Sequence, residues 1–162
     1  MELGTKLESA LTKYFQDLSP SPYPAYFDPA AQVIPGEAES EIEGQYICCR
    51  TAETSDEEMP LDTGNVFWNC EVELRTPARI NAPADTDPSQ FEKHQAMSTV
   101  LEDAILVDNL DAALTTAAAA LGSGYELTVF AVQDRRPARS QSEDGYSSGW
   151  GFRVYCCSRS FS

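Results

Sequence analysis

The segment 66–75 constrains the fold more than any other part of the chain, because two kinds of side chain alternate along it. It reads Val-Phe-Trp-Asn-Cys-Glu-Val-Glu-Leu-Arg. In an extended strand, successive side chains point to opposite faces of the sheet. The even-numbered residues are apolar, whereas the odd-numbered ones are Phe67, Asn69, Glu71, Glu73 and Arg75. The segment therefore predicts a strand with one buried face and one outer face, and the outer face is expected to be a subunit contact or a channel wall.

Three further segments carry strand patterns, over 45–51, 125–133 and 150–158. Between the last two strands, the segment 134–149 is polar and rich in glycine and serine. Such a composition is typical of a loop, so we expect a hairpin with a long, mobile tip there. We interpret the glycines at 149 and 151 as residues that flank a strand and mark its boundary.

Two segments carry helical patterns. Apolar residues three and four positions apart, such as Leu7 and Leu11, predict an amphipathic helix over 2–18. A second pattern covers 88–121, with Asp87-Pro88 as a cap and first helical residue. The pattern leaves open whether this stretch is one bent helix or two. Gly122-Ser123-Gly124 is expected to end it.

A proline-rich segment over 19–44 separates the first helix from the first strand. Prolines lack the backbone amide and disfavour a helix before them, so this segment is expected to be an extended arm. Its aromatic residues Tyr23, Tyr26 and Phe27 are expected to hold the arm to the surface or to a neighbouring subunit.

Taken together, these elements predict a single α+β domain over 1–162. It would contain a small mixed or antiparallel β-sheet packed by a long helix, an N-terminal helix over 1–18, the arm over 19–44 and the core over 45–162. A chain of 162 residues can bury such a core without a metal or disulfides. No apolar run approaches the length that spans a bilayer, and the first residues lack a signal-peptide pattern, so a cytosolic protein is expected.

Five cysteines, at 48, 49, 70, 156 and 157, do not have the spacing of a zinc site. Neighbouring residues on a strand point to opposite faces, so Cys48 and Cys49 should not chelate a metal together. We interpret the cysteines as small apolar residues of strands. The sequence predicts no metal and no cofactor.

Charge is the strongest compositional feature. The formal net charge is −15, from 26 acidic and 11 basic residues. This excess argues against a general DNA-binding surface, which needs clustered lysine and arginine. It is compatible with a wall that repels DNA and lets it slide past. Nine acidic residues lie in 37–62, and Glu53, Asp56, Glu57 and Glu58 are candidates for an exposed loop or for the lining of a lumen.

Arg135, Arg136 and Arg139 form the only basic cluster. We expect them to pair with the acidic loop 53–62 of a neighbouring subunit; the alternative is a solvated loop balanced by Asp134, Glu143 and Asp144. Phe67 on the outer face of its strand is a further candidate contact.

His94, the only histidine, lies in the predicted helix, where a structural role is favoured over catalysis. No nucleophile elbow, Walker loop, zinc-protease or dinucleotide motif is present, so no catalytic residue is assigned.

The order helix, extended linker, strands, helix and hairpin resembles the tail terminator and tail-completion proteins of long-tailed bacteriophages. Four features carry the resemblance: the helix 7–15 with its L-x-x-x-L pair, the strand 69–76, the helix entry from Asp87-Pro88 to His94, and the late Gly-Trp strand at 149–156. The likeness covers most of the chain in outline.

This resemblance implies a structural virion protein without enzymatic activity. Copies of such a protein form a ring, typically a homohexamer, that caps the tail tube and joins it to the head-tail connector or stopper protein. It would be assembled in the host cytoplasm and reside in the neck of the virion, with genomic DNA passing through its lumen without specific binding. Two alternatives remain open: another phage neck or tail-tube component, and a small cytosolic enzyme or regulatory domain.

Overall fold

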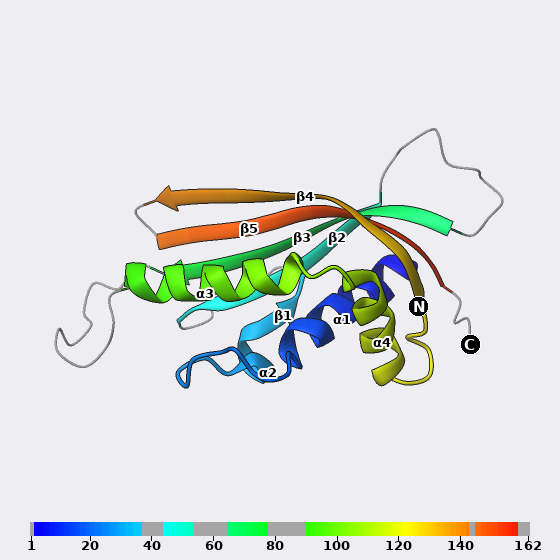
Figure 1. The fold of residues 1–162 in the computed structure, drawn as a ribbon, viewed down its shortest axis with the longest axis horizontal. Coiled ribbons are helices and arrows are strands. Elements are labelled where there is room, and N and C mark those ends of the chain that lie inside the picture. The colour runs from blue at the N-terminus through cyan, green and yellow to red at the C-terminus, as the bar shows by residue number, and fades with distance from the viewer. Residues whose placement is uncertain (1, 37–43, 54–64, 78–89, 143–144, 159–162) are drawn as a thin grey trace.

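The computed structural model describes residues 2–36, 44–53, 65–77, 90–142 and 145–158 (Figure 1). These residues form four helices and five strands. In chain order they are α1 Leu3–Gln16, α2 Pro29–Gln32, β1 Val33–Pro35, β2 Tyr46–Glu53, β3 Asn65–Pro77, α3 Gln90–Ile105, α4 Leu110–Ala120, β4 Thr128–Ser142 and β5 Gly145–Cys157. The predicted α+β class is confirmed.

The strands form one sheet in the order β1-β2-β3-β5-β4. The short β1 is parallel to β2, and the other neighbours are antiparallel. Strands β3 and β5 pair along their whole length, from Asn65 opposite Cys157 to Pro77 opposite Gly145. The sheet is therefore mixed, with the longest strands in its middle and at the β4 edge.

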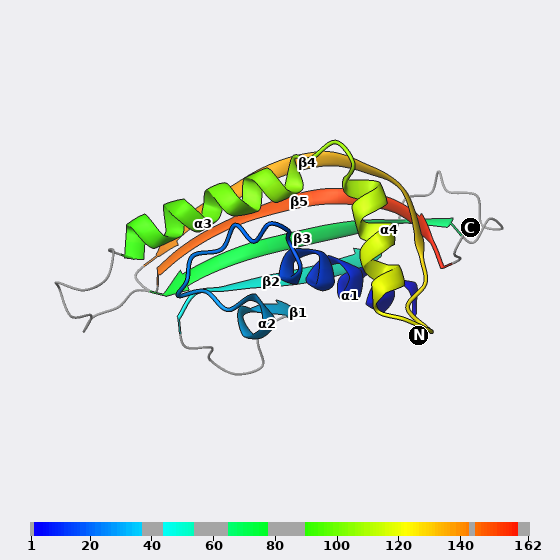
Figure 2. The same ribbon diagram turned by 60° about the horizontal axis from the view of Figure 1, so that its bottom comes forward.

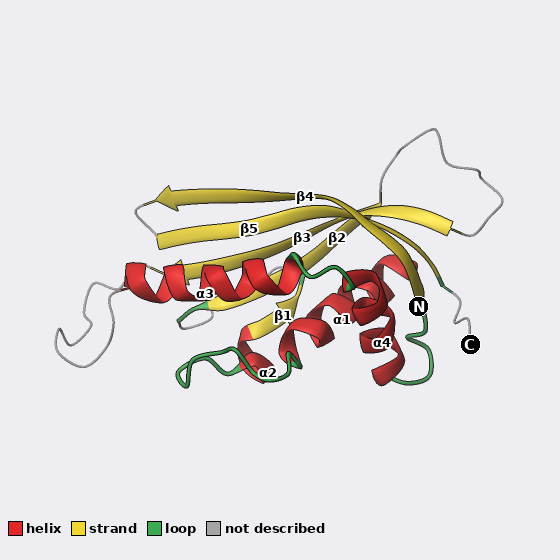
Figure 3. Ribbon diagram, in the orientation of Figure 1, coloured by secondary structure: helices red, strands yellow, loops and turns green. Residues whose placement is uncertain are grey.

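The helices α1, α3 and α4 all lie on one face of the sheet (Figures 2 and 3). Helix α1 packs against β2 and α4, whereas α3 runs along β3 and β5. The core lies between the two layers, where Leu7, Leu11 and Phe15 of α1 are fully buried. No described helix covers the opposite side of the sheet, which we call the open face (Figure 1).

The predicted alternation along 66–75 is confirmed by the burial of β3. Cys70, Val72 and Leu74 are buried toward the helices, whereas Asn69 and Glu71 are exposed on the open face. Burial of three apolar side chains of this kind stabilises the fold by about 1.5–3 kcal/mol each, before the cost of ordering the chain.

The segment 88–121 contains two helices rather than one. Helix α3 ends at Ile105, and α4 begins at Leu110. Both bordering side chains are buried, but α4 packs on α1 and β4, whereas α3 packs on β3 and β5. Since the two helices pack against different elements, the chain turns between them. Gly122, at φ +94°, follows α4 as predicted; the proposed start at Asp87-Pro88 lies outside the described residues.

The expected hairpin loop over 134–149 is wrong, because β4 continues to Ser142 and β5 begins at Gly145. The polar and glycine-rich residues of β5 pair with β3 on one side and with β4 on the other. These ladders satisfy the backbone polar groups and outweigh the low strand propensity of glycine and serine. Pro137 is tolerated because β4 is an edge strand. Gly149 and Gly151 lie inside β5 rather than next to it.

The proline-rich arm contains more structure than an extended linker. It includes α2, whose first turn is capped by the Asp28 carboxylate accepting a hydrogen bond from the Ala30 amide. It then adds β1 to the sheet, with Val33 opposite Ile47. Pro35 ends this edge strand, and the proline limits further pairing there.

Candidate interaction surface

Charged residues of the neighbouring strands β2 and β3 meet on the open face. Arg50 of β2 donates to Glu71 at 2.5 Å and to Glu73 at 2.8 Å, both on the neighbouring β3. Arg75 donates to the other oxygen of Glu73. Burial acts to raise the pKa of Glu73, but the hydrogen bonds from Arg75 and Arg50 outweigh it and lower the pKa. Glu73 therefore stays ionised at neutral pH and holds the two arginines in place.

An aromatic group lies further along the same face. The rings of Phe67 on β3 and Tyr155 on β5 have centroids 4.8 Å apart, and Phe130 of β4 lies 5.4 Å from Tyr155. The Arg153 guanidinium stacks over Phe67 at 4.6 Å. Phe130 is 40% exposed. The predicted outer position of Phe67 is thus confirmed, within a group that joins three strands.

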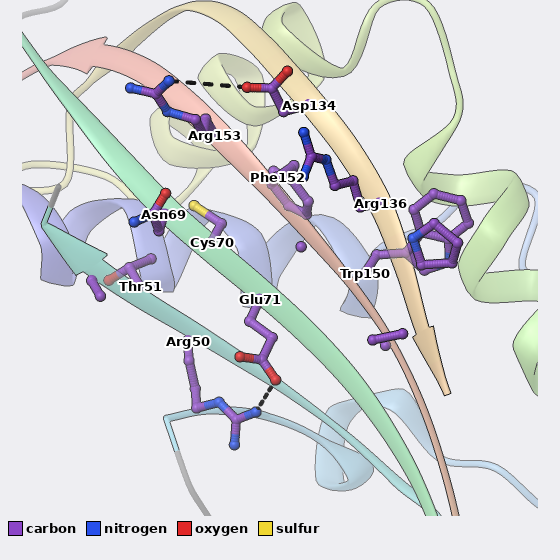
Figure 4. A pocket seen from close by; sticks show the side chains of 15 residues that line it. Arg50, Thr51, Asn69, Cys70, Glu71, Asp134, Arg136, Trp150, Phe152 and Arg153 are labelled. Carbon is purple, nitrogen blue, oxygen red and sulfur yellow. Dashed lines mark hydrogen bonds and ion pairs between the residues drawn. The ribbon is translucent and has the colours of Figure 1, made fainter. Parts of the chain in front are cut away.

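A hollow of about 790 Å³ lies between these groups, over the middle of the sheet (Figure 4). Gly149 and Gly151 of β5 line it and contribute no side chain. On the β3 side the hollow is bordered by Glu71 with its partner Arg50, and on the β4 side by Arg136 (Figure 4). The sequence patterns did not predict this hollow. The signal that was available is a Gly-x-Gly spacing inside an alternating strand pattern.

The three arginines of the predicted basic cluster lie on β4, but they do not act together. Arg135 donates to the Val107 carbonyl at 2.8 Å, on the helix side. Arg136 is opposite Gly151 on the open face. Arg139 is opposite Ser148, on the side of the sheet that holds His94. Alternation along the strand separates them, so of the three only Arg136 belongs to the open face.

An irregularity in β4 determines where Arg136 lies. The register with β5 shifts between Gln133 and Arg136, as in a β-bulge. Asp134 lies within this shift at φ +56°, a left-handed conformation that aspartate tolerates better than most residues. Its carboxylate is 4.0 Å from the Arg153 guanidinium (Figure 4). The bulge changes the alternation of β4 and thereby puts Arg136 beside the hollow.

The aromatic residues of the arm lie mostly against their own chain. Phe27 is buried and stacks on Tyr23, with ring centroids 4.9 Å apart. The Tyr23 hydroxyl donates to the Phe15 carbonyl of α1. Tyr26 remains 42% exposed, with the Lys93 ammonium 4.8 Å above its ring. Of the three, Tyr26 is the residue that presents most surface for a neighbouring subunit.

The acidic candidates fall largely outside the described part of the chain. Glu53 is the last residue of β2. Asp56, Glu57 and Glu58 lie in 54–64, outside the described residues, and their predicted place in a loop or lumen stays a prediction.

His94 connects α3 to the sheet through a buried chain of hydrogen bonds. Its Nδ1 lies 2.7 Å from Thr76 Oγ1, and its Nε2 lies 2.7 Å from Ser148 Oγ. Thr76 Oγ1 also accepts a hydrogen bond from the Gln45 amide. A hydroxyl beside an imidazole is the geometry of a nucleophile and a base, but Ser148 is 7% and His94 6% exposed. A substrate has no access to them, so the arrangement favours a structural role.

The five cysteines are all buried and free, on β2, β3 and β5. This confirms their interpretation as small apolar strand residues. Within the described ranges, no group of three histidine, cysteine or acidic side chains has the arrangement of a metal site. None of the described helices has the length and apolar character needed to cross a membrane.

No protein-family model and no curated protein matches this sequence. The residues and the fold of the chain itself must therefore indicate its function.

Proposed function

We propose that this chain is a ring-forming structural subunit of the neck of a long-tailed bacteriophage, of the tail terminator or tail-completion class. The observation that carries the proposal is the open face of the sheet. It bears an arginine-glutamate network, an aromatic group and a hollow, and no described helix of the same chain covers it. Such a mixed polar and aromatic surface is typical of a contact between proteins.

The order of elements supports the same assignment. The resemblance to tail terminator proteins is based on the order helix, extended linker, strands, helix and hairpin; the chain contains the helix, strands, helical segment and hairpin in that order, whereas its linker carries α2 and β1. A closed ring needs one heterologous contact that each subunit repeats with the next. The open face can supply one side of this contact.

The charge of the chain fits a passage for DNA. A net charge of −15 gives a ring of several copies a strongly negative field. Acidic side chains facing a lumen would repel the phosphates and let the duplex pass without sticking. In this proposal the tail tube and the head-tail connector or stopper protein contact the two ends of the ring, and DNA is not bound specifically.

The mass of the purified protein under native conditions tests the ring. We expect a closed oligomer, with six copies as the leading expectation, and a central hole in averaged electron-microscope views. A protein that stays monomeric from micromolar concentration upward would contradict the proposal. An assembled ring with a neutral or basic lumen would contradict the part of the proposal that concerns DNA passage.

Antibody labelling of virions tests the position in the particle. Labelling confined to the junction of head and tail is the expected result. Labelling along the tail would instead favour the alternative, in which the chain is another neck or tail-tube component.

A further inference from the structure

Two glycines in the middle of a strand require an explanation. Gly149 and Gly151 lie on the open face of β5, which has a neighbouring strand on each side. Glycine in a strand interior weakens the strand, and it often marks a place where another backbone or a ligand approaches closely. The two residues therefore raise the question of what each glycine accommodates.

The fold accounts for Gly149 but not for Gly151. A Cβ atom at position 149 would lie 3.0 Å from the Val72 carbonyl oxygen, which is tighter than ordinary contact. A Cβ atom at position 151 would meet nothing closer than the Cys70 carbonyl oxygen at 3.9 Å, and the φ of Gly151 lies outside the left-handed region. The packing of this chain would thus admit a side chain at 151, although that side chain would fill the hollow.

Arg136 gives the hollow its charge on the β4 side. It is exposed, directly opposite Gly151, and it forms no ion pair with any residue in the described ranges. Across the hollow, Glu71 already accepts a hydrogen bond from Arg50. The guanidinium of Arg136 is therefore a cation beside a cavity, on a chain with 26 acidic and 11 basic residues.

We propose that the hollow over Gly151 receives an acidic segment of a second copy of this chain, with a carboxylate of that segment pairing with Arg136. This inference rests on the ring proposed above and names one side of its repeated contact. Charge complementarity selects the occupant, because a second copy is rich in carboxylates whereas a nucleic acid would be repelled by the excess of negative charge. The absence of a side chain at Gly151 lets the incoming segment approach the sheet closely.

Two substitutions test the two parts of this contact. Gly151→Val fills the hollow without a backbone clash in the chain itself, and Ser147→Val is its control, because Ser147 lies on the same face of β5 outside the hollow. Arg136→Gln removes the cation, and Lys13→Gln is its control, because it changes the net charge equally on α1. Thermal unfolding of each variant verifies that the subunit is folded.

The readout is the dissociation constant of the oligomer, from native mass or sedimentation measurements at low ionic strength. We expect Gly151→Val and Arg136→Gln each to weaken assembly about tenfold or more, and both controls to assemble like the wild type. The effect of Arg136→Gln should shrink as salt is added.

The outcomes separate the two proposals. A wild type that assembles, with Gly151→Val and Arg136→Gln variants that assemble equally well, overturns the docking site and leaves the ring standing. A wild type that never assembles overturns both. Binding of a labelled DNA duplex that is lost in the Arg136→Gln variant would put a nucleic acid in the hollow and overturn the choice of occupant.

Discussion

His94 Nε2 lies 2.7 Å from Ser148 Oγ, and this hydrogen bond joins helix α3 to strand β5 between the two layers of the domain. On its other side the imidazole reaches Thr76 of β3 at 2.7 Å. A single side chain thus connects the helix to two adjacent strands. Since the sheet positions the open face, the stability of this connection affects the proposed interaction surface.

Truncation of the His94 side chain should destabilise the fold. We expect His94→Ala to lower the free energy of unfolding by about 2–4 kcal/mol, because it removes two buried hydrogen bonds and leaves a cavity. Gln95→Ala, at the exposed neighbouring position of α3, is the control and should change stability little. Urea unfolding measures both variants. A loss similar to that of the control would show that the connection is unimportant.

Acid should weaken the same connection. Burial lowers the pKa of His94 from its usual 6.5, and the positive charge of Arg139 lowers it further. Below about pH 6.5 the unfolded chain therefore binds a proton at this residue that the folded chain does not, so stability falls as the pH falls through this range. We expect a smaller loss between pH 7.5 and 5.5 in His94→Gln than in the wild type. Equal losses would contradict this role of His94.

Helix α1 contacts the sheet too closely at Gly4 to admit a side chain. A Cβ atom there would lie 2.6 Å from two carbon atoms of the Trp68 ring. Gly4→Ala is expected to destabilise the fold by about 1–3 kcal/mol, despite the higher helix propensity of alanine. Thr5→Ala, at an exposed position of the same helix, is the matched control. The measurement is denaturant unfolding followed by tryptophan fluorescence, and equal stability of the two variants would contradict the clash.

The left-handed backbone conformation at Asp134 should make the stability of the bulge depend on which residue replaces the aspartate. Asp134→Gly and Asp134→Val both remove the carboxylate that lies 4.0 Å from Arg153, but only glycine adopts φ +56° without strain. We expect the valine variant to be less stable than the glycine variant by about 1–2 kcal/mol. Thermal unfolding of the pair gives the difference, and the reverse order would show that the bulge relaxes.

The cysteines should be inert in the folded protein. All five are buried, and burial raises the pKa of Cys49, Cys70 and Cys156, the last to about 12. Because the thiolate is the reactive form, a thiol reagent should modify the native protein slowly. In urea all five should react. Rapid modification without denaturant would show that at least one of these strands opens readily.

Sequence patterns predicted the local structure where one periodicity dominates. The alternation along 66–75 and the helical spacing of Leu7 and Leu11 led directly to β3 and α1. The hairpin was predicted with strands that are too short, because 134–149 has the composition of a loop. Residues 136–142 of this segment pair with β5 across the hairpin, and 145–149 also pair with β3, more than 60 residues earlier in the chain. Pairing at such a distance in sequence leaves little local signal.

Some properties of the candidate surface also follow from the sequence, whereas others depend on the tertiary structure. The sequence by itself determined that one face of β3 is buried and the other polar, because a strand of period two separates its side chains wherever it is placed. It also determined the excess of acidic charge. Only the tertiary structure decided that Arg136 lies on the open face and Arg135 and Arg139 on the helix side, because it made this segment a strand and set its register with a bulge. Likewise, only the sheet order set Gly151 between Glu71 and Arg136, because strand neighbours follow from packing of the whole domain rather than from the residues beside them.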